Sequence, residues 1–315
     1  MVSAFCYKAD KPEVRGEIMR YQLSAALGCF AVFFVGCGGE PKLTQGSGSS
    51  ALRFSGEISH VLALGDSLAA GHQLAPDEPG HCCGRDGYAD QLYAVLGAAN
   101  PKLRLHVLGC GSETTETMIH GGGLCTYENG SQLDDAVQWI KNKDISLVTI
   151  DIGANDVLAC LRQPDPSACL PGTFSSVAAN LATIVRALRA ALGPDVPLLG
   201  MNYYNPMIAQ WLKGTELDRQ TAIASQTSIV APFNDLLELV YLSQGATAVA
   251  DVETAFASAD FTSENPTMVE VAPGTSIPLT VANICAYTWM CSAGDIHPNT
   301  AGYALIADTF LHLLP

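Results

Sequence analysis

The chain has 315 residues, 48% of them hydrophobic, and its 16 basic and 31 acidic residues give a formal net charge of −15 at pH 7. This length and apolar content allow one sizeable buried core, and the acidic excess argues against nucleic acid or an anionic membrane surface as the main partner. The 11 cysteines are many for a protein of the reducing cytosol.

The first 36 residues are predicted to be a signal peptide, with Met19 as an alternative start. The apolar run YQLSAALGCFAVFFVG follows Arg20, and it is too short for a comfortable membrane span but suits the apolar region of a signal. It ends just before Cys37, which resembles a bacterial lipoprotein box, where the cysteine is acylated and becomes the new N-terminus. A plain secretory signal that is cleaved nearby is the alternative, and both interpretations predict export.

Residues 37–57 are predicted to be a linker. The stretch GGEPKLTQGSGSSALRFSG is rich in glycine and serine and is not expected to fold. We therefore expect a flexible tether in front of one globular domain, residues 58–315.

An even number of cysteines in an exported protein indicates disulfides. The close spacing of Cys160 with Cys169, and of Cys285 with Cys291, predicts two bonds that pin loops. Eight cysteines remain past Cys37: Cys82, Cys83, Cys110, Cys125, Cys160, Cys169, Cys285 and Cys291.

The neighbours Cys82 and Cys83 are expected to pair outward, to Cys110 and Cys125 in some order. A zinc site made of these four cysteines is the alternative. It ranks below the disulfides because the sequence has no Cys-x-x-Cys spacing here.

From residue 58 onward, apolar strand-like runs alternate with helix-like stretches, which is typical of a parallel sheet with helices on both faces. The stretch 260–294 is expected to be irregular, and Pro232 is expected to kink or break the long helical region that contains it. The expected strands are 58–64, 102–108, 145–152, 197–204 and 246–252. The expected helices are 88–96, 131–142, 174–192, about 216–243 and about 300–313.

Three polar turns each follow an expected strand: Gly65-Asp66-Ser67, the loop 109–115, and Gly153-Ala154-Asn155-Asp156. In a parallel sheet these turns converge on the carboxyl edge, where open α/β sheets bind ligands. His297 approaches from the C-terminal segment, and Pro298 follows it.

Ser67, His297 and Asn155 suit nucleophilic catalysis. A serine hydroxyl is a weak nucleophile near neutral pH and needs an adjacent base, usually histidine. The oxyanion that forms when it attacks an ester needs donors held in place beforehand, and backbone N–H groups or an asparagine amide can supply them.

These turns resemble the sequence blocks of the SGNH hydrolases, also called the GDSL family of esterases and lipases. Gly65-Asp66-Ser67-Leu68 matches the nucleophile block, Gly153-x-Asn155-Asp156 the asparagine block, and Asp295-Ile296-His297-Pro298-Asn299 the histidine block. The resemblance covers roughly residues 58–314. It implies a three-layer α/β/α sandwich around a mostly parallel, flavodoxin-like sheet, here of five strands, and a mechanism without metal or cofactor.

The resemblance also assigns roles to single residues. Ser67 would be the nucleophile, with its backbone N–H as one oxyanion donor, and His297 would be the base. The side chain of Asn155 would be another donor. Asp66 and Asp156 are interpreted as residues that support their turns.

Two positions depart from the family pattern. The second block commonly reads Cys-x-Gly-Glu-Thr-Thr, and a match without gaps puts Ser112 at the glycine that donates its N–H to the oxyanion; Gly111 is the alternative after a shift of one residue. The family acid usually lies three residues before the histidine, where this chain has Gly294. Asp295, two residues before, is expected to orient His297, with a backbone carbonyl as the alternative.

Two interpretations are open for each of several other residues. Tyr203 and Tyr204 are expected to line a substrate pocket or to pack in the core. His72, His81 and His120 are expected to be solvated or to line the pocket. Tyr287, Trp289 and Met290 would form an apolar lip near the site or a stapled loop without contact to substrate.

These features predict an exported serine ester hydrolase of the bacterial cell envelope or the medium. Its partners would be a small-molecule or lipid ester and, through a lipid anchor at Cys37, the membrane. A carbohydrate deacetylase or an acyltransferase would use the same catalytic groups. A surface lipoprotein that only binds a ligand is the alternative from another class.

Overall fold

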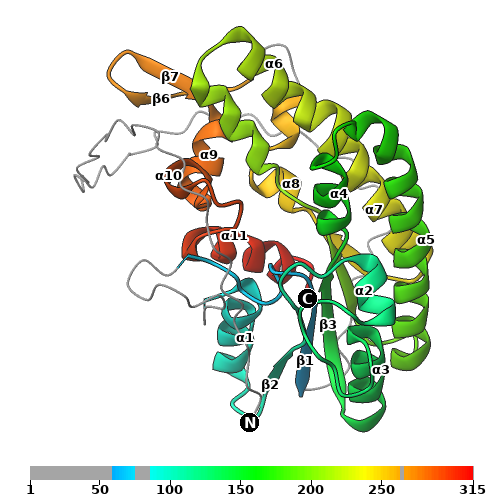
Figure 1. Cartoon of the computed structure of the whole chain (residues 1–315). Helices are drawn as coiled ribbons and strands as arrows, with labels where there is room; N and C mark the ends of the chain where they lie inside the picture. Colours follow the sequence, from blue (N-terminus) through cyan, green and yellow to red (C-terminus); the bar gives the residue numbers. More distant parts are fainter. Residues whose placement is uncertain (1–58, 75–85, 263–265, 315) are drawn as a thin grey trace, which may run out of the picture. The chain divides into compact units, whose positions relative to one another are not determined.

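The domain is built on a parallel sheet with the strand order β2-β1-β3-β4-β5 (Figure 1). The computed structural model describes residues 59–74, 86–262 and 266–314. The signal peptide, the linker, Cys37, His81 and the Cys82–Cys83 pair lie outside these residues. The strands are β1 (His60–Gly65), β2 (Arg104–Val107), β3 (Ile145–Asp151), β4 (Leu198–Met201) and β5 (Ala248–Ala250).

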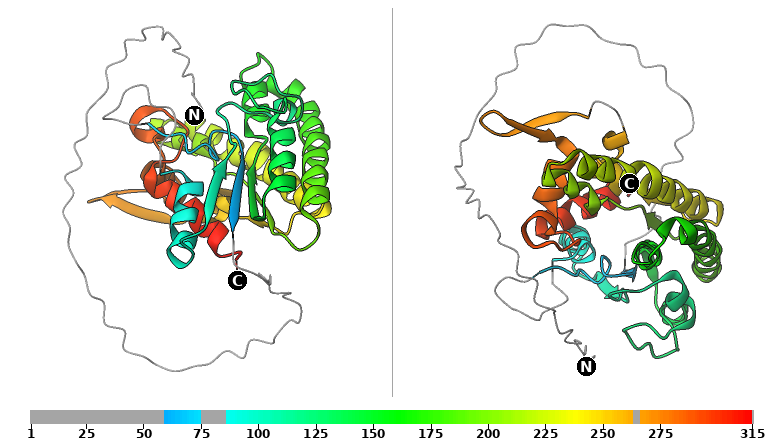
Figure 2. Two further views of the ribbon diagram at one scale, coloured as in Figure 1. Left: turned by 90° about the horizontal axis from the view of Figure 1, so that it is seen from below. Right: turned by 45° about the horizontal axis from the view of Figure 1, so that its top comes forward.

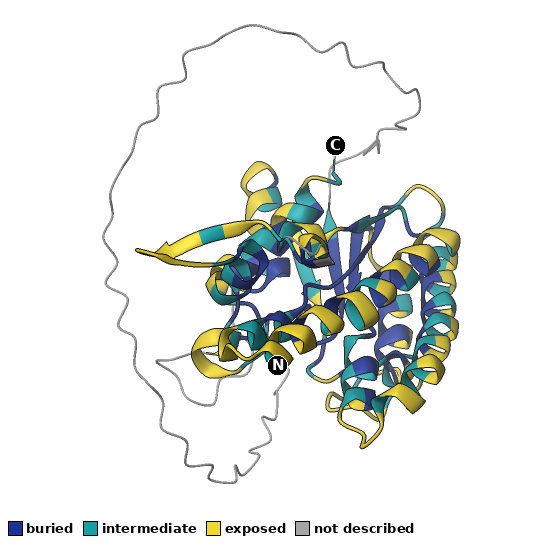
Figure 3. Cartoon of the chain, turned by 90° about the horizontal axis from the view of Figure 1, so that it is seen from above, coloured by how far each residue is buried: buried dark blue, intermediate teal, exposed yellow. Residues whose placement is uncertain are grey.

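Buried apolar strands explain why this sheet is parallel and central. Val61 to Leu64 of β1 and Leu147 to Ile150 of β3 have no exposed surface, as expected for strands covered on both faces. All strand pairs that the structure describes within this sheet run parallel, so β1 and β3 end at the same edge. Figure 3 shows the buried strands between helices whose outer faces are exposed.

Helices form a layer on each face of the sheet (Figure 2). On one face α1 (Tyr88–Ala99) packs against α11 (Thr300–Leu311). On the other face α5 packs against α3, α4 and α7. These elements span Gln132–Asn142 (α3), Ala154–Leu161 (α4), Pro166–Leu192 (α5) and Ala231–Ser243 (α7). The three-layer α/β/α prediction is confirmed.

Helix α5 is long and apolar enough to cross a membrane by length and composition. Its stripe of Val177, Leu181, Ile184 and Leu188 is nevertheless fully buried in the domain. The helix therefore contributes to the core of the α/β domain. It begins earlier than predicted because Asp165 caps Ala168 and Pro166 occupies the first turn.

The prediction for 260–294 was wrong, because this stretch contains regular elements. They are the hairpin of β6 (Met268–Ala272) and β7 (Thr275–Pro278), then α9 (Leu279–Tyr287) and α10 (Met290–Ala293). The predicted helix 216–243 is divided into α6 (Glu216–Ser225), a π-helical turn η2 (Gln226–Val230) and α7, with Pro232 in the first turn of α7. The remaining short helices are α2 (Thr115–His120), η1 (Pro206–Lys213), α8 (Val252–Ala255) and η3 (Ala259–Thr262).

The structure corrects the predicted pairing of the first four cysteines. Cys110 is bonded to Cys125, so neither is bonded to Cys82 or Cys83. The physical reason is that Cys125 returns to the end of β2 after α2, which brings it within a Cα–Cα distance of 6.1 Å of Cys110. The two pairs predicted from close spacing, Cys160–Cys169 and Cys285–Cys291, are present.

Candidate active site

Ser67 stands on the turn that follows β1. Gly65 has a φ of 134°, a conformation that favours glycine, and a Cβ there would lie 2.0 Å from the carbonyl oxygen of Asp151 in β3. Oδ1 of Asp66 accepts the backbone N–H of Leu68 at 2.9 Å and closes the turn. The end of β1 thus holds the serine at the carboxyl edge of the sheet.

His297 lies between this serine and an acid. Its Nε2 is 2.9 Å from Oγ of Ser67, and its Nδ1 is 2.7 Å from Oδ1 of Asp295. The same oxygen accepts the backbone N–H of His297 at 2.9 Å, so an aspartate only two residues before the histidine reaches both groups. In this geometry Asp295, and not a backbone carbonyl, is the partner of the ring.

The surroundings keep Asp295 ionised. Burial raises the pKa of its carboxyl, but the hydrogen bonds from the ring and backbone of His297 outweigh this effect and hold the pKa below its usual value. A carboxylate in this place favours the Nδ1–H tautomer of His297 and leaves Nε2 able to accept the serine proton.

The loop after β2 brings the predicted oxyanion residues to the same edge. Ser112 has a φ of 61°, in the left-handed region that non-glycine residues rarely adopt. Gly111 has no such φ, and a Cβ there would meet nothing within 4 Å. The backbone therefore requires glycine-like freedom at Ser112 and not at Gly111, which favours the match without gaps. Asn155 lies beside this loop, because its Nδ2 donates to the carbonyl of Glu113 at 2.9 Å.

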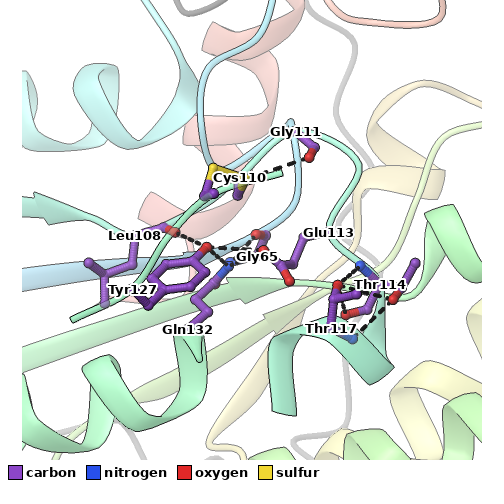
Figure 4. The surroundings of a disulfide bond; sticks show 10 residues. Gly65, Leu108, Cys110, Gly111, Glu113, Thr114, Thr117, Tyr127 and Gln132 are labelled. Carbon is purple, nitrogen blue, oxygen red and sulfur yellow. Dashed lines mark hydrogen bonds between the residues drawn. A yellow bond between two sulfur atoms is a disulfide. The ribbon is translucent and has the colours of Figure 1, made fainter. Parts of the chain in front are cut away.

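A buried amide, Gln132, joins this loop to the nucleophile turn (Figure 4). Its Oε1 accepts the N–H of Gly65 at 2.6 Å, and its Nε2 donates to the carbonyl of Gly65 at 3.0 Å. Nε2 also donates to the hydroxyl of Tyr127 at 2.8 Å, and that hydroxyl lies 3.0 Å from Oε2 of Glu113. The disulfide of Cys110 closes the same loop. The turn that carries Ser67 and the loop 109–115 are therefore held as one unit.

Asp156 supports the other end of the loop 109–115, whereas the sequence interpretation was that it supports its own turn. Its carboxylate accepts the N–H of Thr115 at 3.0 Å and the Thr115 hydroxyl at 2.7 Å. Burial raises the pKa of Asp156, and the bonds from Thr115 offset part of that rise. Through Thr115 the carboxylate fixes the start of α2 against α4.

Two carboxyl groups lie beneath Ser67. Asp66 is 2% exposed and Asp151 is fully buried, and the two side chains are hydrogen-bonded to each other. Tyr203 donates to Asp66 at 3.1 Å, and Tyr88 donates to Asp151 at 2.7 Å. Burial raises the pKa of both carboxyls, and the charge of Asp66 raises the pKa of Asp151 further.

An apolar cavity of about 100 Å³ opens beside Ser67 and His297. Tyr203 and Tyr204 line it while each is only 6% exposed, so both residues border the cavity and pack in the core. The Tyr204 hydroxyl donates to the carbonyl of Ile296 at 2.6 Å, next to the candidate base. The aliphatic and aromatic walls are Leu68, Ala154, Val157, Leu158, Leu161, Pro206, Met207, Ile229, Val230 and Phe233.

Comparisons with known proteins show the family to which this chain belongs. The model of the GDSL-like Lipase/Acylhydrolase family matches residues 63–305, which is well over half of the chain. The chain belongs to this family. No curated protein matches the sequence.

Several solved structures are similar to this GDSL-like domain at low sequence identity. A GDSL-like lipase from Parabacteroides merdae is 13% identical, with a TM-score of 0.52 over 84% of this chain and 98% of that chain. An extracellular lipase from Streptomyces rimosus is 18% identical, with a TM-score of 0.46 over 80% of this chain and 99% of that chain. A psychrotrophic esterase from Pseudoalteromonas sp. is 16% identical, with a TM-score of 0.42 over 81% and 95%.

The other residues that the sequence singled out differ in whether they lie near His297 or the cavity. His72 packs its ring against His297, with ring centroids 4.2 Å apart, whereas His120 is exposed and faces Glu116. Among the described residues, the lining of the cavity does not include Tyr287, Trp289 or Met290. The sequence did not indicate a role for Gln132, Tyr127 or Asp151, because none of them belongs to the sequence blocks of the family.

Proposed function

We propose that this protein is an exported serine esterase that cleaves carboxylic esters with apolar acyl groups. The observation that carries the proposal is the chain of contacts from Ser67 Oγ through His297 to Asp295, at 2.9 and 2.7 Å. These distances lie within the hydrogen-bond reach required of a nucleophile, a base and the group that orients the base.

In the proposed mechanism Ser67 attacks the acyl carbonyl while Nε2 of His297 takes the hydroxyl proton. The histidine returns that proton to the leaving alcohol, which releases it and leaves an acyl-enzyme. Water then gives a proton to His297 and attacks the acyl carbon, and the acid departs as the serine regains its proton. Asp295 stabilises the imidazolium formed in each half.

The oxyanion would be bound by the amide of Asn155 and the backbone N–H groups of Ser67 and Ser112, with Gly111 as the alternative to Ser112. Asn155 now donates to the carbonyl of Glu113, and its second amide hydrogen is available to a ligand. Donors that are already oriented stabilise developing charge without reorganisation during the reaction.

The cavity supports an acyl group of a few carbons as the part of the substrate bound next to Ser67. Its volume of about 100 Å³ is of the order that admits a benzene-sized group, for which about 150 Å³ suffices. Its walls contain more branched aliphatic surface than an acetyl group needs, which favours short fatty acyl esters over the acetylated sugars that a deacetylase would use.

Export is supported by three disulfides in the described residues, because such bonds persist in oxidising compartments. We propose that Cys37 is acylated and tethers the domain to the bacterial cell envelope through the linker. Wild type in the membrane fraction and Cys37→Ala in the soluble fraction would support this anchor. Equal amounts of both proteins in the membrane fraction would contradict it.

Labelling with a fluorophosphonate probe, followed by peptide mass spectrometry, tests the function. We expect an adduct on Ser67 that is absent in His297→Ala and accompanies loss of ester hydrolysis in Ser67→Ala. A folded, oxidised protein that takes no label would refute the esterase and favour the ligand-binding lipoprotein.

A further inference from the structure

One histidine beside the proposed catalytic centre has no part in the proposed mechanism. His72 lies five residues after Ser67, and its ring packs at 4.2 Å from the ring of His297, with an angle of 36° between the planes. Its backbone is fixed at both ends, because its N–H donates to the carbonyl of Ser67 at 2.9 Å and its carbonyl accepts the hydroxyl of Tyr303 at 2.6 Å. The fold therefore holds a second imidazole over the first.

The two imidazoles and a carboxylate form a set of metal donors. One ring nitrogen of His72, one of His297 and a carboxylate oxygen of Asp295 lie within 4.8 Å of one another, and all three residues are partly exposed. In the described parts of the chain, no other group of three histidine, cysteine or acidic side chains comes this close together. Two nitrogens and one oxygen are donors that zinc accepts, and the solvent can supply a fourth ligand.

We propose that His72, Asp295 and His297 form an inhibitory zinc site, which shuts off the esterase by taking its base out of use. The proposal rests on the proposed function for its effect on activity, but not for the binding of the metal.

The geometry requires only a small adjustment. Ligands of one zinc ion lie about 2.0–2.2 Å from it, so neighbouring ligands are about 3.3 Å apart in a tetrahedral site. Asp295 and His297 already approach to 2.7 Å. The donor nitrogen of His72 lies within 4.8 Å of the other two donor atoms and must come closer to them. It can do so if the His72 ring turns about its side-chain bonds, because the ring makes no hydrogen bond among the described residues.

Either nitrogen of His297 would lose its catalytic use when metal binds. A zinc ion on Nδ1 replaces the hydrogen bond between Nδ1 and Asp295, whose carboxylate then binds the metal. The ring proton moves to Nε2, which can then no longer accept the proton of Ser67. A zinc ion on Nε2 occupies that lone pair directly. In both cases zinc lowers the rate of acylation of Ser67 although the metal does not occupy the acyl cavity.

The first test measures hydrolysis of a short-chain nitrophenyl ester by the purified full chain while zinc chloride is titrated in a buffer that does not chelate it. We expect inhibition at micromolar zinc that a chelator reverses, and none from calcium or magnesium at the same concentration, because those ions prefer oxygen ligands. No inhibition at millimolar zinc would overturn the proposal.

Matched variants assign the effect to His72. His72→Phe keeps a ring against His297 but has no donor atom, and His72→Gln has a weaker one. We expect the zinc concentration for half inhibition to rise by about 10–100-fold or more, since losses of supporting groups around metal sites already cost this much in affinity. Equal inhibition of wild type and His72→Phe would contradict the site.

A second histidine pair provides the control. His60 and His106 approach to 3.0 Å on β1 and β2, so His106→Gln removes another place where zinc can bind two imidazoles. Inhibition of this variant should match wild type, and its loss would refute the assignment to His72.

Titration calorimetry separates the metal site from the esterase. Because His60 and His106 could bind zinc as well, calorimetry uses the His106→Gln background. We expect one zinc ion per chain there, with or without Ser67→Ala, and a loss of this binding when His72→Phe is added. If no ester is hydrolysed, calorimetry alone still decides the site, and a wild type that binds no zinc refutes it even if the esterase is active.

Discussion

The two sides of Ser67 differ in how they are built. On one side, the loop 109–115 and Gln132 present directed hydrogen bonds, and those between Gln132 and Gly65 join buried groups. On the other side, α4, η2 and α7 present an aliphatic cavity of about 100 Å³. Directed bonds fix atoms to within fractions of an ångström, whereas apolar contacts are tolerant of shape. For the proposed esterase, we expect the polar side to set the rate and the apolar side to set the range of substrates.

The largest effect should follow from removing one donor of the polar side. Asn155→Ala should lower kcat by about 10²–10³-fold with little change in KM, because its amide acts on the oxyanion and not on the ground-state ester. Steady-state kinetics with a short-chain ester measures this. Asn180→Ala is the control, since Asn180 bonds to Thr115 at 3.1 Å on the same loop. A mainly raised KM in Asn155→Ala would contradict the division between the two sides.

Gln132→Ala should damage the polar side without touching a reacting atom. It leaves the N–H and the carbonyl of Gly65 without their partner, and unsatisfied buried groups cost about 1–3 kcal/mol in the free energy of unfolding. Misplacement of the turn should also lower kcat, by up to about 10²-fold. Urea denaturation and kinetics measure the two effects.

Gln138→Ala, on the exposed face of the same helix, should stay within about 0.5 kcal/mol of wild type. If Gln132→Ala keeps full kcat, the buried amide stabilises the fold but does not position the site.

The buried acid pair adds a dependence on pH to the polar side. Because the pKa of Asp151 is raised in the folded state, the folded protein binds a proton there that the unfolded chain has released above its ordinary pKa near 3.8. The stability from this group is therefore complete below that pKa and is lost as pH rises. The asparagine in Asp151→Asn cannot ionise. The unfolding free energy of this variant, relative to that of wild type, should therefore increase as the pH rises from 4.

Urea denaturation of both proteins across this pH range tests the inference. Parallel curves of unfolding free energy against pH would show that Asp151 has the same pKa in the folded and unfolded states. The test depends on how the difference between the two proteins changes with pH, not on its size at one pH.

Most of the fold and the principal candidate residues could be predicted, because they rest on local pattern. The run Ile145–Asp151 is apolar enough to specify a buried strand, and strand ends in a parallel sheet meet at one edge. Asp295 could be named because a two-residue turn is short enough for its carboxylate to reach the ring of His297.

What the sequence did not predict depends on contacts between distant segments. Gln132 serves Gly65, which lies 67 residues away, and no spacing indicates that pairing. The bond between Cys110 and Cys125 depends on the path of α2, since connectivity does not follow from cysteine positions alone. The β6–β7 hairpin did have a local signal, the dipeptide Pro273-Gly274, where Gly274 has a φ of 74°.

The apolar side should give the smallest effect on rate and the clearest effect on selectivity. Leu161 lines the cavity from the end of α4, and Leu161→Ala enlarges it. The ratio of kcat/KM for an octanoyl ester to that for an acetyl ester should rise by about tenfold, since one methylene in an apolar pocket is worth about 10–200-fold. Leu217→Ala, at a side chain that is 72% exposed on α6, should leave the ratio unchanged. If Leu161→Ala instead lowers kcat for both esters equally, the cavity wall positions the catalytic groups, and the division of labour between the two sides does not hold.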